Sequence, residues 1–308
     1  MTRWTTAEVG DQHGRTVVIT GANTGIGLAT AKVFAERGAT VVLACRDGDK
    51  ARQALAAVEG SAASACPLDL ASLGSIRAAA QRIRDEHPRV DLLIANAGIM
   101  MTPLATTADG FESQLGTNHL GHFAFTGLLL DRMVDVPGSR VVVVSSSANR
   151  QGAIDLADLH FRQRRYRPAA AYGQSKLANL HFAVELNARL ASAAAETIAV
   201  ALEPGVTPTE LARHTRGAMR LAVRATTRLL GQPDAAAGAR VVLRAATDPQ
   251  TLGGDYYAPD GRPPLRARGY PVRIEPRPVD AETGRALWLE SERLTGVDYA
   301  ILRRPVRG

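Results

Sequence analysis

Short apolar runs alternate with longer stretches of helical character along the first 205 residues of the chain. The runs are rich in Val, Ile and Leu, as in strands that are buried on both faces of a parallel sheet. They cover Thr16–Thr20, Thr40–Ala44, Ala65–Leu68, Asp91–Ala95, Arg140–Ser145 and Ile198–Leu202. The intervening stretches predict helices at Gly25–Arg37, Gly48–Glu59, Ser72–Glu86, Gly110–Val134 and Ala169–Ala193. This alternation predicts βαβ units, and hence a doubly wound α/β sheet.

The pattern changes after Gly205. A basic helical stretch covers about 206–231, and a further helix is predicted at Pro233–Ala246. Gly253–Ala258 has the pattern of a last strand, and Asp280–Leu294 that of a short terminal helix. Residues 259–278 contain six prolines, which predicts an irregular surface segment. We therefore expect a single domain over 1–308, with its core at about 14–258 and a C-terminal extension at 259–308.

Composition excludes several classes of protein. No window of 18 apolar residues occurs, so no membrane-spanning helix is expected. The first 15 residues are polar and lack the apolar core of a secretory signal. The two cysteines, Cys45 and Cys66, form neither a disulfide framework nor a CxxC metal site. These features favour a cytoplasmic protein.

The chain carries 37 basic and 30 acidic residues, a net charge of +7, and only three of its cations are lysine. Such a charge is compatible with nucleic acid, an acidic membrane or an anionic ligand. No nucleic-acid-binding motif accompanies it, so no nucleic-acid partner is expected. Five arginines form one face of the basic stretch after Gly205, at positions 213, 216, 220, 224 and 228. A solvated face is favoured there over two alternatives: a lid over an acidic or amphiphilic substrate, and contact with an anionic membrane surface.

The first predicted strand runs directly into a glycine-rich turn, and a helix follows at once. The turn reads Thr20-Gly21-Ala22-Asn23-Thr24-Gly25-Ile26-Gly27. Glycines let the backbone approach a phosphate, and the N–H groups at the start of the helix can bind the anion. Within a βαβ unit, the turn favours dinucleotide binding over a simple strand-to-helix connection.

Six segments in a fixed order resemble the short-chain dehydrogenase/reductase superfamily. The glycine turn has its T-G-x-x-x-G-x-G form. The other segments are Asn96-Ala97-Gly98, Asn118, Ser145-Ser146-Ser147, Tyr172-x-x-x-Lys176 and Pro204-Gly205. The loop Ala148–Ala171 and the string Ala44-Cys45-Arg46 resemble the retinol-dehydrogenase-like branch. The resemblance covers about 14–258 and implies a single Rossmann-type domain, with a substrate lid at about 206–231.

The resemblance also implies a nicotinamide cofactor. An acid at the end of the second strand of such folds selects NAD(H), whereas an arginine there suits the 2′-phosphate of NADP(H). The position holds Cys45 followed by Arg46, so NADP(H) is favoured over NAD(H). Asp47 is the alternative reader of the ribose, or a cap of the next helix. The resemblance implies cofactor contacts at Gly21, Asn23, Thr24, Gly25, Ile26, Gly27, Arg46, Asp69, Leu70, Asn96, Ala97, Gly98, Tyr172, Lys176, Pro204, Gly205 and Thr209. A role as a turn or capping acid is the alternative for Asp69.

Tyr172 and Lys176 are four residues apart in a stretch of helical character, which places them on one face. A phenol with a pKa near 10 can act as an acid, and a nearby ammonium can lower that pKa enough for it to act as a base too. The resemblance implies that Tyr172 transfers the substrate proton, that Lys176 also binds the nicotinamide ribose, and that Asn118 holds a water. Ser146 is expected to face the substrate oxygen, because strand alternation turns the serines on either side of it away.

These residues predict an oxidoreductase that interconverts a small-molecule carbonyl compound and its alcohol. Apolar residues at Ile99-Met100-Met101 and in Leu211–Val223 favour a hydrophobic or amphiphilic substrate over a sugar phosphate. The superfamily resemblance implies a homodimer or homotetramer through helices at 110–134 and 170–193.

Three alternatives to this function are less favoured by the sequence. A nucleotide-sensing protein without turnover could have the same fold, but loss of Tyr172 or Lys176 would favour it and both are present. A membrane-peripheral enzyme is the second alternative. The third is a metal site at His119 and His122, which lacks a suitable third ligand nearby, so no metal is expected.

Overall fold

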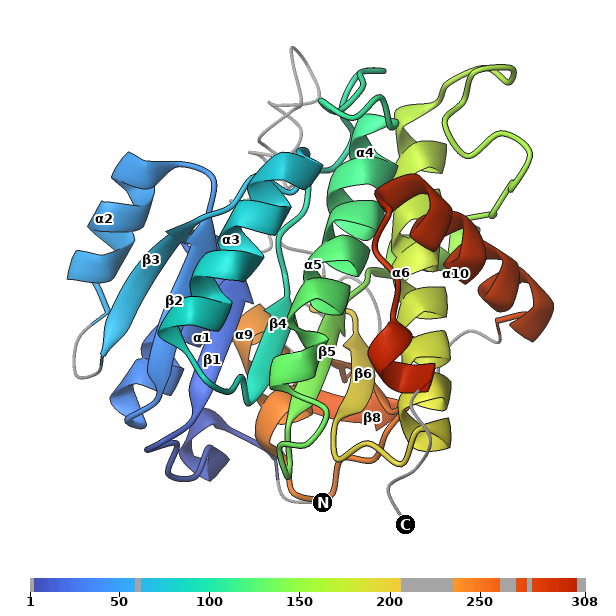
Figure 1. The fold of residues 1–308 in the computed structure, drawn as a ribbon. Coiled ribbons are helices and arrows are strands. Elements are labelled where there is room, and N and C mark those ends of the chain that lie inside the picture. Colours follow the sequence, from blue (N-terminus) through green and yellow to red (C-terminus); the bar gives the residue numbers. More distant parts are fainter. Residues whose placement is uncertain (1–2, 59–61, 206–234, 261–269, 276–278, 304–308) are drawn as a thin grey trace, which may run out of the picture.

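The computed structural model describes residues 3–58, 62–205, 235–260, 270–275 and 279–303. These residues form an eight-stranded sheet in the order β3-β2-β1-β4-β5-β6-β7-β8 (Figure 1). The strands are β1 (Thr16–Thr20), β2 (Thr40–Cys45), β3 (Ala63–Pro67), β4 (Leu92–Ala95), β5 (Arg140–Val144), β6 (Ile198–Leu202), β7 (Tyr256–Pro259) and β8 (Pro271–Ile274). The first seven pair in parallel, as predicted for a doubly wound α/β sheet.

Helices cover both faces of the sheet (Figure 1). The α-helices are α1 (Gly25–Glu36), α2 (Gly48–Ala56), α3 (Leu73–Glu86), α4 (Ser113–Leu115), α5 (Gly121–Leu129), α6 (Pro168–Ser192), α9 (Ala235–Thr247) and α10 (Ala281–Thr295). One core cluster joins α3, α5, α6 and α10 to one face, and a second joins α1, α2 and α9 to the other. Successive strand side chains alternate between them: Val18 belongs to the first cluster, whereas Val17 and Ile19 belong to the second. This two-faced burial explains why the strand sequences are apolar throughout.

The helix predicted at 110–134 is not continuous. Its residues form α4, a π-helical turn η2 (Gly116–Leu120), α5 and a 3-10 turn η3 (Leu130–Arg132). A single π-turn inside an α-helix is often found at functional sites. Here the π-turn contains Asn118, one of the predicted catalytic residues.

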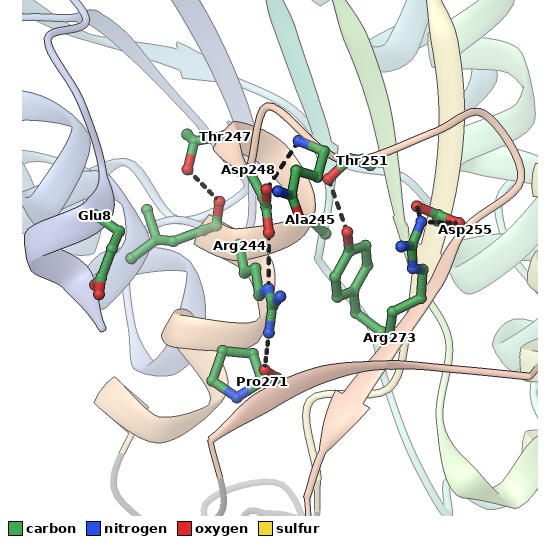
Figure 2. A network of polar contacts seen from close by, with 12 residues as sticks. Glu8, Arg244, Ala245, Thr247, Asp248, Thr251, Asp255, Pro271 and Arg273 are labelled. Atoms are coloured by element: carbon green, nitrogen blue, oxygen red, sulfur yellow. Dashed lines mark hydrogen bonds and ion pairs between the residues drawn. The ribbon is translucent and has the colours of Figure 1, made fainter. Parts of the chain in front are cut away.

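The prediction of an irregular segment at 259–278 is wrong in part. Residues Pro271–Ile274 form β8, which pairs antiparallel with β7 and adds an edge strand to the sheet. Arg244 of α9 holds this strand by donating to the Pro271 carbonyl while its Nε donates to Asp248 at 2.9 Å (Figure 2). Arg273 pairs with Asp255 in the loop before β7 (Figure 2). The pairing and these contacts make this part of the C-terminal extension regular.

The terminal helix predicted at Asp280–Leu294 is confirmed as α10, with Asp280 as its N-cap. It packs on α5 and α6 through an aromatic cluster of Phe123, Phe182, Trp288 and Tyr299. Tyr299 Oη, which lies beyond the helix, donates to the Phe123 carbonyl at 2.8 Å. The extension is therefore part of the core.

Two further predictions concern the substrate lid and membrane-spanning helices. The predicted lid at about 206–231 lies outside the described residues. Among the described residues, no helix is long and apolar enough to cross a membrane.

Candidate active site

The glycine turn connects β1 to α1 at the carboxyl edge of the sheet. Gly21 and Gly25 have φ values of +67° and +58°, a left-handed conformation that favours glycine. A Cβ at Gly27 would lie 2.6 Å from the Gly21 carbonyl oxygen and 2.7 Å from Asn96 Nδ2. The turn is thus packed too closely for any other residue at Gly27, and the N-cap residue Thr24 makes no side-chain capping bond to α1.

Thr20, the residue before the turn, joins it to the segment after β4. Its Oγ1 accepts hydrogen bonds from the backbone N–H groups of Asn96 and Ala97, both at 2.9 Å. The Asn96 side chain returns a bond from Nδ2 to the Thr20 carbonyl, also at 2.9 Å. The predicted residues Asn96 and Ala97 are therefore held beside the glycine turn.

The end of β2 carries the residues predicted to select the cofactor. Cys45 is buried, and burial raises the pKa of its thiol to about 11, although the N–H groups of Ala22 and Asn23 hydrogen-bond to it. Arg46 is exposed and makes no hydrogen bond or ion pair to any described residue. Asp47 caps α2 through the Lys50 N–H at 3.1 Å and pairs with Lys50 Nζ at 2.7 Å. Arg46 is therefore available to a ligand, whereas the Asp47 carboxylate is already bound.

Asp69 and Leu70 follow β3. Asp69 Oδ1 accepts from the Ala71 N–H at 3.0 Å, which closes a local turn, the alternative role considered for it. Leu70 is buried, and its carbonyl and side chain pack on Gly121 of α5. Both residues have structural partners in this turn, and contact with the adenine ring stays a prediction.

Asn118 lies in the π-turn with both ends of its side chain bonded. Its Oδ1 accepts from the Ile99 N–H at 2.8 Å, and its Nδ2 donates to the Ile99 carbonyl and to Ser175 Oγ, both at 2.9 Å. Asn118 thus ties the segment after β4 to α6. A Cβ on Gly98 would lie 3.2 Å from Asn118 Oδ1 and 3.5 Å from Lys176 Nζ, so these two polar atoms meet beside Gly98.

Tyr172 and Lys176 lie one turn apart on α6, as predicted. Both are buried, and Lys176 Nζ lies 5.9 Å from the centre of the Tyr172 ring. Lys176 Nζ donates to the carbonyl of Val144, the last residue of β5, at 3.0 Å. This bond orients the ammonium toward the carboxyl edge of the sheet, where the glycine turn and Asn118 also lie.

The three serines after β5 have different environments. Ser145 is buried, and its hydroxyl donates to the Lys176 carbonyl at 2.8 Å. Ser147 is exposed. Ser146 is half-buried between them and is the N-cap of the 3-10 helix η4 (Ser147–Gln151), where its Oγ accepts from the Ala148 N–H at 3.3 Å. The environments favour Ser146 among the three, but its role in catalysis stays a prediction.

Sequence reasoning missed the contact that places η4 on α6. Gly152, which ends η4, lies against Gly173, the residue after Tyr172: a Cβ on Gly173 would be 3.2 Å from Gly152 Cα and 3.1 Å from the Ala148 carbonyl oxygen. A Cβ on Gly152 would overlap the Gly173 backbone. The glycine in Tyr172-Gly173-Gln174 was the available signal, because glycine inside a helix often marks a close packing contact.

His119 and His122 point to different partners. His122 Nδ1 faces the Asn118 carbonyl at 2.8 Å, so it donates, and Nε2 accepts from Thr20 Oγ1 at 2.9 Å. His119 Nε2 lies 2.9 Å from Ser291 Oγ of α10. Burial lowers the pKa of His119 to about 3 and that of His122 to about 4, which makes both neutral. No cluster of potential metal ligands occurs among the described residues.

The Pro204-Gly205 turn, which follows β6, forms a further part of the site. Pro204 is buried and Gly205 has a φ of +84°. A Cβ on Gly238 of α9 would touch both Ile26 and Pro204, so this helix brings the glycine turn and the Pro204-Gly205 turn together. Thr209 lies outside the described residues. The described residues thus fit a dinucleotide: a glycine turn at a helix start, an available arginine and two closing turns lie on one edge.

Comparisons with known proteins agree with this arrangement. Residues 15–220 match the model of the short chain dehydrogenase family. The chain is 43% identical over 300 residues to retinol dehydrogenase 13 of Homo sapiens, covering 94% of this chain and 87% of that protein. It is 38% identical over 294 residues to polyprenol dehydrogenase of Mus musculus, covering 92% and 85%. A crystal structure of an uncharacterized protein from Mycobacterium Paratuberculosis has a TM-score of 0.80 at 43% identity, covering 97% of this chain and 99% of that chain.

The fold, the site and these similarities define an oxidoreductase that acts on alcohols and carbonyl compounds. The chain belongs to the short chain dehydrogenase family, in its retinol-dehydrogenase-like branch.

Proposed function

We propose that the protein is an NADP(H)-dependent oxidoreductase that interconverts a hydrophobic alcohol and its carbonyl compound, with Tyr172 as the general acid and base. The observation that carries the proposal is the placement of Tyr172, Lys176 and Asn118 on one edge of the sheet, next to the glycine turn. Bound NADP(H) would supply or accept the hydride.

The chain's own residues would manage the proton and the substrate oxygen. In the reduction direction, Tyr172 Oη donates its proton to the carbonyl oxygen as negative charge develops there. The ammonium of Lys176, held near the tyrosine by the Val144 carbonyl, stabilises the phenolate that remains. The Ser146 hydroxyl donates to the same substrate oxygen and stabilises its charge.

The preference for NADP(H) is supported by the residues after β2. The Arg46 side chain is exposed and has no ion-pair partner among the described residues, and a guanidinium can bind a phosphate through two parallel hydrogen bonds. The Asp47 carboxylate already accepts from the Lys50 N–H at the start of α2 and pairs with the Lys50 ammonium. Because this pairing offsets its charge, Asp47 would repel a 2′-phosphate less than an unpaired carboxylate would. The buried Cys45 thiol provides no charge.

A hydrophobic substrate is supported by the loops at this edge and by the relatives. The loop after β4 exposes Met101 and Leu104, and the loop after η4 exposes Leu156. Tyr166 joins the two loops by donating to the Thr102 carbonyl at 2.9 Å. The names of the similar proteins describe retinol and polyprenol dehydrogenases, which act on long apolar alcohols.

The decisive test is Tyr172→Phe, which removes only the hydroxyl. The parent is expected to reduce apolar aldehydes or ketones with NADPH, whereas the variant should lose at least about 100-fold in kcat, in the range for general acid–base catalysis. NADPH binding, measured by fluorescence titration, should change little. A variant as active as the parent would contradict the mechanism. A parent that binds NADPH but turns over no member of a panel of apolar alcohols and aldehydes would favour a nucleotide sensor.

A further inference from the structure

The short helix η4 carries an arginine that pairs with a buried glutamate directly after β6. Arg150 Nη1 and Nη2 donate to Glu203 Oε2 and Oε1 at 3.0 and 3.1 Å, a bidentate geometry. Glu203 is 1% exposed, whereas the Arg150 side chain is 43% exposed. Glu203 directly precedes Pro204-Gly205. The pair therefore bridges the segment after β5 and the turn after β6.

Further polar side chains extend this bridge across the site. Tyr256 Oη of β7 lies 3.4 Å from Glu203 Oε2 and donates to it. Asn149 Nδ2 donates to Tyr256 Oη at 3.1 Å and to Ser145 Oγ at 3.3 Å. Ser145 in turn donates to the Lys176 carbonyl. The network thus runs from β7 through η4 to Lys176 of α6, one helical turn after Tyr172.

Glu203 is held by the sheet, whereas the short helix that carries Arg150 depends on tertiary contacts. The Glu203 N–H donates to the Tyr257 carbonyl at 2.9 Å, so its backbone belongs to the sheet ladder. Arg150 belongs to a five-residue 3-10 helix, a length that is not stable without tertiary contacts. Ser146 is the N-cap of this helix, and Gly152 at its other end rests on Gly173. Between these two ends, Arg150 and its neighbour Asn149 supply the lateral side-chain contacts of the helix.

We propose that Arg150 is a positioning residue: its pair with Glu203 holds η4, and with it the Ser146 hydroxyl, against the Pro204-Gly205 turn. This inference rests on the proposed function of the same site. Arg150 acts through Ser146 and exchanges no proton with the substrate. A misplacement of about 1 Å can reduce a rate about 100-fold, so loss of the pair should act on kcat.

Three variants separate positioning from stability: Arg150→Met, Glu203→Gln and the double variant. Arg150→Met should be the least stable, because it removes two charge-assisted hydrogen bonds from a buried carboxylate. The double variant should regain part of that stability, because both charges are then absent. Its kcat should nevertheless stay at least tenfold below that of the parent, as in Arg150→Met. The Kd for NADPH should change less than about threefold, because no cofactor contact is removed.

Two matched variants complete the design. Arg150→Lys keeps the positive charge but replaces the two-pronged guanidinium with a single ammonium nitrogen. Its kcat should therefore lie between those of Arg150→Met and the parent. Arg244→Met removes another arginine–carboxylate pair, the i,i+4 contact with Asp248 on α9, together with the bond to the Pro271 carbonyl of β8 (Figure 2). It should lower stability and leave kcat within about twofold of the parent.

If kcat of the double variant recovered together with its stability, the Arg150–Glu203 pair would serve stability alone. That result overturns the inference and leaves the proposed function intact. If the parent itself shows no turnover, the proposed function fails, and hydrogen exchange of the backbone N–H groups of residues 147–151 tests the contact directly. Faster exchange in Arg150→Met than in Arg244→Met is expected, and equal exchange would overturn the inference.

Discussion

At the scale of single residues, the proposed preference for NADP(H) rests on two neighbours with opposite charge. Arg46 is exposed and unpaired among the described residues, and Asp47 is bound to the start of α2. A charge-assisted hydrogen bond contributes about 1.5–3 kcal/mol, or roughly a tenfold to hundredfold change in affinity.

Arg46→Ala should therefore weaken NADPH binding at least about tenfold and leave NADH binding nearly unchanged. Fluorescence titration of both cofactors measures the ratio. Arg52→Ala is the control, because Arg52 lies on α2 and is paired with Asp49. An unchanged ratio of the two Kd values in Arg46→Ala would show that another residue reads the phosphate.

Gly152 should tolerate no side chain. Its φ of −72° suits any residue, but a Cβ would overlap the Gly173 backbone next to Tyr172. Gly152→Ala is therefore expected to displace η4, lower kcat at least tenfold and cost about 1–3 kcal/mol of unfolding free energy. Gly10→Ala is the control, because a Cβ there meets open space. Steady-state kinetics and urea unfolding decide between these outcomes.

Residues in local motifs could be predicted from the sequence, whereas long-range pairs could not. Tyr172 and Lys176 share a helix face because they are four residues apart. Arg150 and Glu203 are 53 residues apart, and nothing in either segment indicates that they meet. Only the parallel pairing of β5 with β6 brings the two segments together.

At the scale of elements, the π-turn and α5 depend on buried neutral histidines. His122 donates to the Asn118 carbonyl, and His119 contacts Ser291 of α10. Burial lowers both pKa values well below the ordinary 6.5. Between about pH 6.5 and pH 4 the unfolded chain therefore takes up protons that the folded chain does not, and stability falls as the pH falls.

The contribution of His122 to this loss should be about 2 kcal/mol between about pH 6.5 and pH 4.5. Urea unfolding of the parent and of His122→Gln at both pH values measures it, because the variant lacks the titrating group. The variant should be less stable at neutral pH and less sensitive to acid. Identical pH dependence in the two proteins would contradict a buried neutral His122.

Element prediction failed where tertiary contacts override the local pattern. Strand β8 begins with Pro271 in a proline-rich segment, and its extended form comes from pairing with β7. The helix predicted at 110–134 has continuous helical character, yet the bonds of Asn118 to Ile99 and Ser175 accompany a π-turn within it. Both differences concern contacts with distant residues.

At the scale of the whole molecule, α10 covers the outer face of α5 and α6 (Figure 1). Neighbouring residues of α10 have opposite environments: Trp288 is 2% exposed and Leu289 is 60% exposed. Trp288→Ala should cost about 3–5 kcal/mol of unfolding free energy and promote self-association through Phe123 and Phe182. Leu289→Ala should change stability by less than about 0.5 kcal/mol. Denaturant unfolding and light scattering distinguish the two, and equal effects would show that the cluster does not stabilise the fold.

The dimer or tetramer expected through helices 110–134 and 170–193 stays a prediction. A partner at these helices would have to use the part of their surface that α10 leaves open, or displace α10. Sedimentation of the parent and of Trp288→Ala compares the two cases.

Because α10 belongs to the chain it covers, its contact with α5 and α6 does not depend on protein concentration. A covering supplied by a second molecule is lost on dilution, whereas a covalently linked segment stays at a high effective concentration. The aromatic cluster should therefore remain closed in the most dilute assay, so that catalytic activity per mole is not lost through exposure of this face.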